Sequence, residues 1–216
     1  MWTSILRVAG ALAAGLLLVA AAPQQTFDLL IRNGRVYDGT GNPWRRADIG
    51  VRGDRIVAVG PVGSLGQAGA AVVIDARDRM VAPGFMDVHS HALEGLTRAE
   101  LRDARPLLAQ GLTLIVANPD GGGGADLTRQ HAALAADGGV GVNVALLIGH
   151  ASVRNAVLDG ARRDPTPEEL ERMRALVRQA VADGAFGLSS GLFYTPGRFA
   201  KTEEVIALAR EAGGVY

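Results

Sequence analysis

Short apolar segments alternate with turn signals from Phe27 to about Met80. Turn-forming pairs stand at Asn33-Gly34 and Gly53-Asp54, and each is flanked by a run with the alternating character of a strand. The pattern predicts strands at residues 27–31, 35–37, 48–51, 55–59 and 72–75. We therefore expect a small β subdomain over residues 24–80.

The rhythm changes after Val81 to apolar strand, loop and helix, repeated at a spacing of about 30 residues. Capping boxes predict helix starts at Thr97 and Thr166, although Pro106 must end or kink the first of these helices. Alternation of this kind predicts an α/β fold with a parallel sheet. Strands are expected at residues 81–88, 112–117, 142–148 and 185–189, and two further helices at residues 126–137 and 202–212.

The length of this second region limits the architecture. A closed eight-unit barrel needs roughly 250 residues, and residues 81–216 supply about four units and the possible start of a fifth strand at 213–216. We predict an incomplete (β/α)8 TIM-type barrel and expect the chain itself to be incomplete. An open half-barrel of this kind would leave a strand edge and an apolar face uncovered.

The first 22 residues differ in composition from the rest of the chain. Arg7 ends a short positive start, an apolar run follows from Val8 to Ala20, and small residues come next. The pattern predicts a signal peptide over residues 1–21, and hence a periplasmic or secreted protein without stable membrane association after cleavage. A membrane anchor is the alternative, but the run falls short of the roughly 20 apolar residues that a span needs.

The composition limits the kinds of substrate and of metal ligand that we expect. The 22 basic and 22 acidic residues cancel, which removes the electrostatic footprint expected of a nucleic-acid-binding protein and favours a small neutral or weakly charged substrate. The chain has no cysteine, so it has neither disulfides nor thiolate metal ligands.

Two histidines, His89 and His91, stand at the end of the apolar segment that begins at Ala82. Residues two apart on a strand face the same side, so both imidazoles should converge on one point. At the carboxyl end of a barrel strand, that point is the active-site mouth. Because neutral imidazole is a good zinc ligand, the pattern predicts a metal site. A chance pair of histidines on a surface strand is the alternative.

The next predicted strand ends at Asp120, which is followed by four glycines. A carboxylate there could complete the metal site, and the glycines would let backbone approach a metal ion or a substrate closely. The alternative is that Asp120 only caps a turn.

His150 ends the third predicted strand and could be a metal ligand, although a role in orienting substrate or in the loop structure is favoured. His131 lies on a predicted helix, where a structural role is the better interpretation. After the fourth strand, Gly187, Ser189 and Gly191 match the spacing of a serine-hydrolase elbow. A partner histidine for Ser189 is not evident in the sequence, and the upstream metal motif already supplies a route to an activated nucleophile.

Several segments together resemble the amidohydrolase superfamily and, within it, the N-acyl-D-amino-acid deacylases, or D-aminoacylases. The resemblance runs from Phe27 to Tyr216. Its general marks are residues 28–34 and 83–91, and its more specific marks are Gly149-His150 and residues 187–197.

The resemblance implies a site that holds one or two divalent ions, zinc above all. His89 and His91 would be metal ligands, and Asp120 stands where the family commonly has a cysteine, which would give a harder oxygen ligand. Tyr194 would contact the substrate. Ser190, whose hydroxyl can hydrogen-bond a carboxylate or an amide, and His150 are the other residues that we predict to bind it. Further histidine ligands and the proton-shuttling aspartate would follow residue 216, so the catalytic residue is unknown and we expect the isolated chain to have little or no activity.

The implied activity is metal-assisted hydrolysis of an amide C–N bond in an N-acyl-D-amino acid or a related dipeptide. Another amidohydrolase, such as a dihydroorotase-like cyclic amidase, is the alternative within the same class. A fragment that must associate with a second chain to close its barrel is an alternative of a different kind.

Overall fold

The computed structural model describes residues 26–66 and 69–216. These residues form two compact units that divide between Pro83 and Gly84. The signal peptide predicted for residues 1–21 lies outside the described residues. Among the residues that are described, no helix combines the length and the apolar character needed to cross a membrane.

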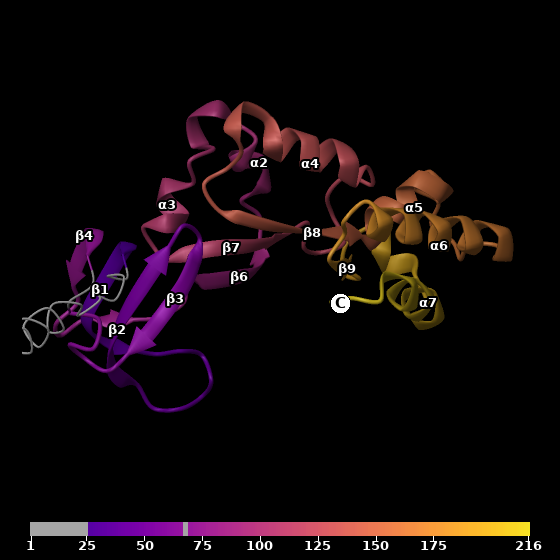
Figure 1. Ribbon diagram of the computed structural model, residues 1–216. Helices are drawn as coiled ribbons and strands as arrows, with labels where there is room; N and C mark the ends of the chain where they lie inside the picture. The colour runs from indigo at the N-terminus through magenta and orange to yellow at the C-terminus, as the bar shows by residue number, and fades with distance from the viewer. Residues whose placement is uncertain (1–25, 67–68) are drawn as a thin grey trace, which may run out of the picture. The chain divides into compact units, whose positions relative to one another are not determined.

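The first unit is a five-stranded sheet in which β1 occupies the central position (Figure 1). β1 pairs antiparallel with β2 and parallel with both β4 and β5, while β3 pairs antiparallel with β2. Its small core is built from Val36, Ala47 and Ile49. The strands are β1 (Phe27–Val36), β2 (Arg45–Arg52), β3 (Arg55–Gly60), β4 (Ala70–Asp75) and β5 (Met80–Val81).

The chain reversal predicted at Asn33-Gly34 is wrong, because β1 continues through both residues. Asn33 adopts a left-handed conformation with φ of 64°, and the pairing with β2 shifts register between Ile31 and Gly34. The Asn33 backbone N–H donates to the buried Asp48 carboxylate at 2.9 Å. A turn signal has therefore produced a β-bulge within one strand, since pairing on both sides keeps the chain extended.

The second unit contains a parallel sheet with the strand order β6-β7-β8-β9, as the alternating pattern predicts. The first predicted strand, at residues 81–88, is divided between the two units: Val81 pairs with β1, and the second sheet begins only after Pro83. Proline has no backbone N–H to donate to a ladder, which explains the interruption. The strands are β6 (Phe85–Ser90), β7 (Leu112–Ala117), β8 (Asn143–Gly149) and β9 (Gly187–Ser189).

Helices cover one face of this sheet and enclose the core, in which Ile115, Leu146, Ile148, Met173 and Leu208 are buried. The helices predicted after Thr166 and over residues 202–212 are confirmed, as is the predicted helix that has Asp126 as its N-cap. The helical segments are α2 (Leu93–Leu96), η1 (Ala99–Leu101), α3 (Arg105–Leu108), α4 (Leu127–Ala135), η2 (Ala136–Gly138), α5 (His150–Leu158), α6 (Pro167–Ala182), η3 (Gly197–Phe199) and α7 (Thr202–Ala212).

One helix prediction is wrong, and one helix was not predicted. Thr97 does not begin a helix: it follows the last residue of α2, and its hydroxyl donates to the Glu94 carbonyl at 2.9 Å. The segment beyond it breaks into η1 and α3, with Pro106 in the first turn of α3. No local pattern predicts α5, which starts directly at His150 where β8 ends.

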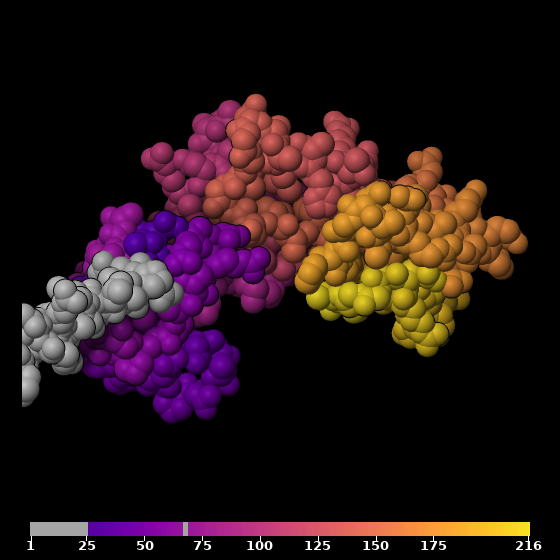
Figure 2. All heavy atoms as spheres, in the orientation of Figure 1, coloured from indigo at the N-terminus to yellow at the C-terminus, as the bar shows by residue number. Residues whose placement is uncertain are grey.

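α6 and α7 lie side by side on the outside of the second unit (Figure 2). Glu211 of α7 accepts a hydrogen bond from Arg174 Nε at 2.8 Å and contacts Arg178 at 3.2 Å. Val215 then forms a parallel bridge with Gly187, where the sequence predicts the start of a fifth strand.

The other face of the sheet is apolar and open. Met86 and Val88 on β6 and Phe186 beside β9 are exposed. This is the uncovered face that the sequence predicts for a half-barrel.

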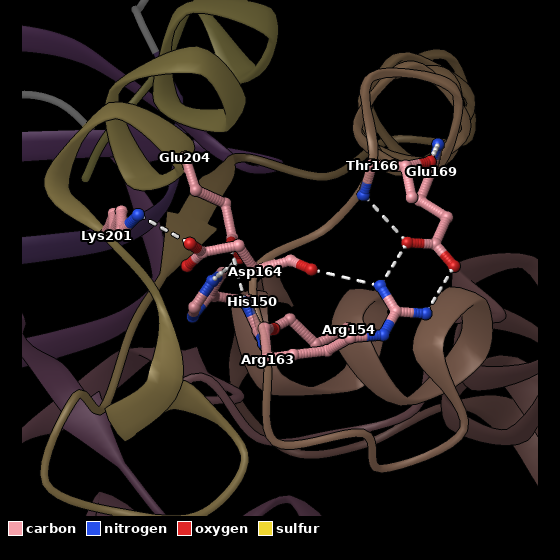
Figure 3. Close-up of polar contacts among 8 residues, drawn as sticks. All are labelled: His150, Arg154, Arg163, Asp164, Thr166, Glu169, Lys201 and Glu204. Atoms are coloured by element: carbon pink, nitrogen blue, oxygen red, sulfur yellow. Dashed lines mark hydrogen bonds and ion pairs between the residues drawn. The ribbon is translucent and has the colours of Figure 1, made fainter.

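Glu169 completes the capping box of α6 and also pairs with Arg163 (Figure 3). The hydrogen bonds from Arg163 and then from the Thr166 backbone N–H lower the pKa of Glu169 from its ordinary value of 4.5 to about 2. Because this pKa is lower in the folded state, the carboxylate stabilises the fold above pH 4.5. That contribution is lost as the pH falls toward 2.

Replacing Arg163 by Ala should therefore raise the pKa of Glu169 toward 4.5. The free energy of unfolding in urea should fall above that pH and change less as the solution is acidified further. NMR titration of the Glu169 carboxyl group measures the pKa, and Arg162→Ala is the matched control because Arg162 lies over Phe199 instead. A Glu169 pKa near 4.5 in the unaltered chain would contradict this account.

Candidate metal centre

His89 and His91 stand at the carboxyl end of β6, and both imidazoles are exposed. Their ring centroids lie 5.5 Å apart, whereas Ser90 between them is buried. The His89 backbone N–H donates to the Asp87 carboxylate at 3.1 Å. The alternation of a strand thus places the two imidazoles on one side, as the sequence predicts.

Asp120 joins them from the loop after β7, the neighbouring strand. Its Oδ2 atom lies 3.3 Å from His89 Nε2 and 3.2 Å from His91 Nε2. The three donor atoms all lie within 4.8 Å of one another. Among the described residues, the Asp120 carboxylate has no backbone N–H partner, so no hydrogen bond supports the alternative in which it caps a turn.

The loop that carries Asp120 has an unusual backbone. Asn118, Asp120 and Gly121 have φ values of 62°, 58° and 74°, which lie in the left-handed region that glycine, asparagine and aspartate tolerate best. The Asn118 side chain donates to the Leu147 carbonyl at 3.0 Å. The Gly121 carbonyl accepts from the Ala151 backbone N–H, also at 3.0 Å. Contacts to β8 and α5 therefore hold the loop.

Two imidazole nitrogens and one carboxylate oxygen form a donor set that suits a catalytic zinc ion with an open coordination position. The cluster has no thiolate, and its oxygen donor also suits harder divalent ions. His89, His91 and Asp120 therefore fit the divalent ion that the sequence predicts.

Two cavities within the second unit adjoin the cluster. The first, of about 620 Å³, is lined by His91, Asp120, Tyr194 and the last three glycines of the loop, residues 122–124. The second, of about 650 Å³, is lined by His89, Asp120, Ser190 and the apolar inner face of the sheet. The Ser190 hydroxyl lies 2.7 Å from the Tyr216 hydroxyl. Tyr194 and Ser190, both predicted to bind substrate, thus border cavities that reach the cluster.

His150 lies apart from the cluster and is fully buried at the start of α5 (Figure 3). Its Nε2 atom lies 2.7 Å from Glu204 Oε1, and the other oxygen of Glu204 accepts from the buried Arg154 guanidinium. Burial opposes the charge on Glu204, yet the hydrogen bonds from His150 and Arg154 lower the pKa of this carboxyl group. This placement favours a role for His150 in holding α5 to α7 over direct contact with substrate.

Sequence reasoning missed Glu204 because nothing local marks it as a partner of a histidine 54 residues away. The buried Arg154 was the available signal, since a fully buried guanidinium needs an anion nearby. His131 on α4 lies away from the cluster, beside Gly184.

The chain matches a known protein family. Residues 72–214 match the model of the amidohydrolase family, and the chain belongs to that family. The parallel sheet with its helices is accordingly part of the family's barrel, which confirms the predicted α/β half-barrel.

Three relatives show the level of similarity. A D-aminoacylase of Alcaligenes xylosoxydans xylosoxydans is 39% identical over 92% of this chain and 45% of its own length. The N-acyl-D-glutamate deacylase of the same organism is 36% identical over 88% of this chain and 42% of its own length. The structure of an N-acyl-D-glutamate deacylase from Bordetella bronchiseptica, complexed with zinc and a phosphonate inhibitor, matches with a TM-score of 0.78 and 36% identity over 88% of this chain and 43% of that one. The chain thus spans less than half the length of these relatives.

Replacing either His89 or His91 by Ala removes one of three donors and should weaken Zn²⁺ binding. Removing a residue that only hydrogen-bonds to a metal ligand already lowers metal affinity about 10–100-fold. Removing a ligand itself should therefore lower the affinity at least about 100-fold. Competition with a chromogenic chelator measures the dissociation constant. His131→Ala is the control, because this histidine lies outside the cluster, and equal weakening in the control would contradict the assignment.

Proposed function

We propose that this protein is a metal-dependent hydrolase of amide C–N bonds that removes the acyl group from N-acyl-D-amino acids. The observation that carries the proposal is the convergence of His89, His91 and Asp120 at the carboxyl edge of the parallel sheet. Active sites of barrel enzymes occupy this edge. The named relatives, a D-aminoacylase and an N-acyl-D-glutamate deacylase, support the choice of substrate.

His89, His91 and Asp120 would hold the ion, and zinc is the metal we propose because of the imidazole donors. A divalent ion bound there supplies Lewis-acid polarisation of a carbonyl and lowers the pKa of water toward about 7. The strand fixes the two imidazoles relative to each other, so the site needs little rearrangement to bind its ion.

The adjoining cavities would take the substrate. Tyr194 lines one of them and Ser190 the other, and the hydroxyl groups of such residues hydrogen-bond a carboxylate or an amide. The apolar lining of the larger cavity, which includes Val88 and Leu147, suits the hydrocarbon part of an acyl group or side chain. A small N-acyl amino acid or dipeptide matches both features.

Export to the periplasm or the medium is part of the proposal and rests on the signal-peptide pattern of residues 1–21. N-terminal sequencing of protein from those fractions should find Ala22 as the first residue. An intact Met1 on the exported protein would contradict it.

A substrate panel tests the proposed function. The 216-residue chain and the product of the gene's whole reading frame, both loaded with zinc, would be given N-acetyl-D-amino acids, their L-enantiomers and dihydroorotate. Whichever of the two proteins is active should hydrolyse the N-acetyl-D-amino acids. His89→Ala should lower its turnover at least about 100-fold, because catalysis needs the ion. Turnover of dihydroorotate alone would favour the cyclic amidase instead.

A further inference from the structure

Ser189 is the last residue of β9, and its hydroxyl reaches the loop that carries Asp120. The hydroxyl donates to the Asn118 carbonyl at 2.6 Å and accepts from the Gly121 backbone N–H at 3.1 Å. Only 7% of the residue is exposed. Both hydrogen bonds are buried and link residues far apart in the sequence.

The two partners of this hydroxyl stand on either side of Asp120, one before it and one after it. Asn118 and Asp120 both have left-handed backbone conformations, which persist in non-glycine residues when the surrounding structure holds them. A single side chain therefore fixes both ends of the short segment on which the Asp120 carboxylate is carried.

The end of β9 and the loop are also too close for a side chain to stand between them. A Cβ atom added to Gly191 would lie 2.2 Å from the Asp120 carbonyl oxygen. A Cβ atom on Gly121 would lie 3.0 Å from the Gly191 backbone nitrogen. This close packing of backbone against backbone keeps the Ser189 hydroxyl in register with its two partners.

These contacts also bear on whether Ser189 is a nucleophile, because the spacing of Gly187, Ser189 and Gly191 matches a serine-hydrolase elbow. The Ser189 proton is directed to a carbonyl oxygen and its lone pair receives an N–H. A hydroxyl held in this way is not oriented as a nucleophile, which needs a general base as its partner. The neighbouring Ser190 faces Tyr216 instead.

We propose that Ser189 is a positioning residue of the metal centre, which holds the loop of Asp120 so that its carboxylate stands beside His89 and His91. The inference rests on the proposed function, since it concerns the same ion. It adds that the fourth strand contributes to metal affinity through hydrogen bonds to backbone, with no contact between Ser189 and the ion.

Ser189→Ala tests this role by removing both hydrogen bonds while leaving all three ligands in place. Zn²⁺ affinity should fall about 10–100-fold, the range seen when groups behind metal ligands are lost. With Co²⁺ in the site, the visible absorption bands should shift or weaken, because the carboxylate is no longer held in one position. Val177→Ala in the α6 core, where Val177 is fully buried, is the control for lost stability and should leave affinity and spectrum unchanged.

Ser189→Thr and Ser189→Val form a second pair of nearly equal volume, of which only the first keeps a hydroxyl. The threonine variant should retain more metal affinity than the valine variant. This comparison remains valid if the alanine variant fails to fold. Equal affinity in Ser189→Ala and the unaltered chain, equal affinity in the threonine and valine variants, or equal weakening by Val177→Ala would overturn the inference. An unaltered chain that binds no divalent ion would instead refute the proposed function.

Discussion

The approach of one carboxylate to two imidazoles is the interaction on which the candidate site depends. Asp120 Oδ2 lies 3.3 Å from His89 Nε2 and 3.2 Å from His91 Nε2, although Asp120 belongs to a different strand-loop unit. Adjacent parallel strands end at one edge of the sheet, so the β6 and β7 termini bring these groups together. Three donors that face one another at the border of two cavities make up a ligand set that suits a divalent cation.

Neighbouring elements hold this arrangement in place. The loop after β7 turns through left-handed conformations, and backbone N–H groups at the start of α5 donate to its Gly121 carbonyl. In the core, the Glu204 carboxylate pairs with His150 and Arg154 and so connects α7 to α5. The position of the Asp120 loop thus results from contacts to β8, β9 and their helices.

Much of the fold and of the candidate site could be predicted from the sequence, because local patterns of residues determine them. The two-residue period of a strand placed His89 and His91 on one side, and the capping box gave the start of α6. Where tertiary contacts prevailed over local signals, prediction failed. Asn33 became a bulge because β1 has partners on both sides, and Thr97 ends a helix where a capping box predicted a start. The pairing of His150 with a residue on α7 depends on the fold and leaves no pattern in the sequence.

Diffraction from crystals soaked in Zn²⁺, recorded at the zinc absorption edge, tests the account most directly. We predict an anomalous peak about 2.0–2.2 Å from His89 Nε2, His91 Nε2 and a carboxylate oxygen of Asp120. A peak elsewhere in the molecule, or a zinc ion bound to the histidines with the Asp120 side chain turned away, would contradict it.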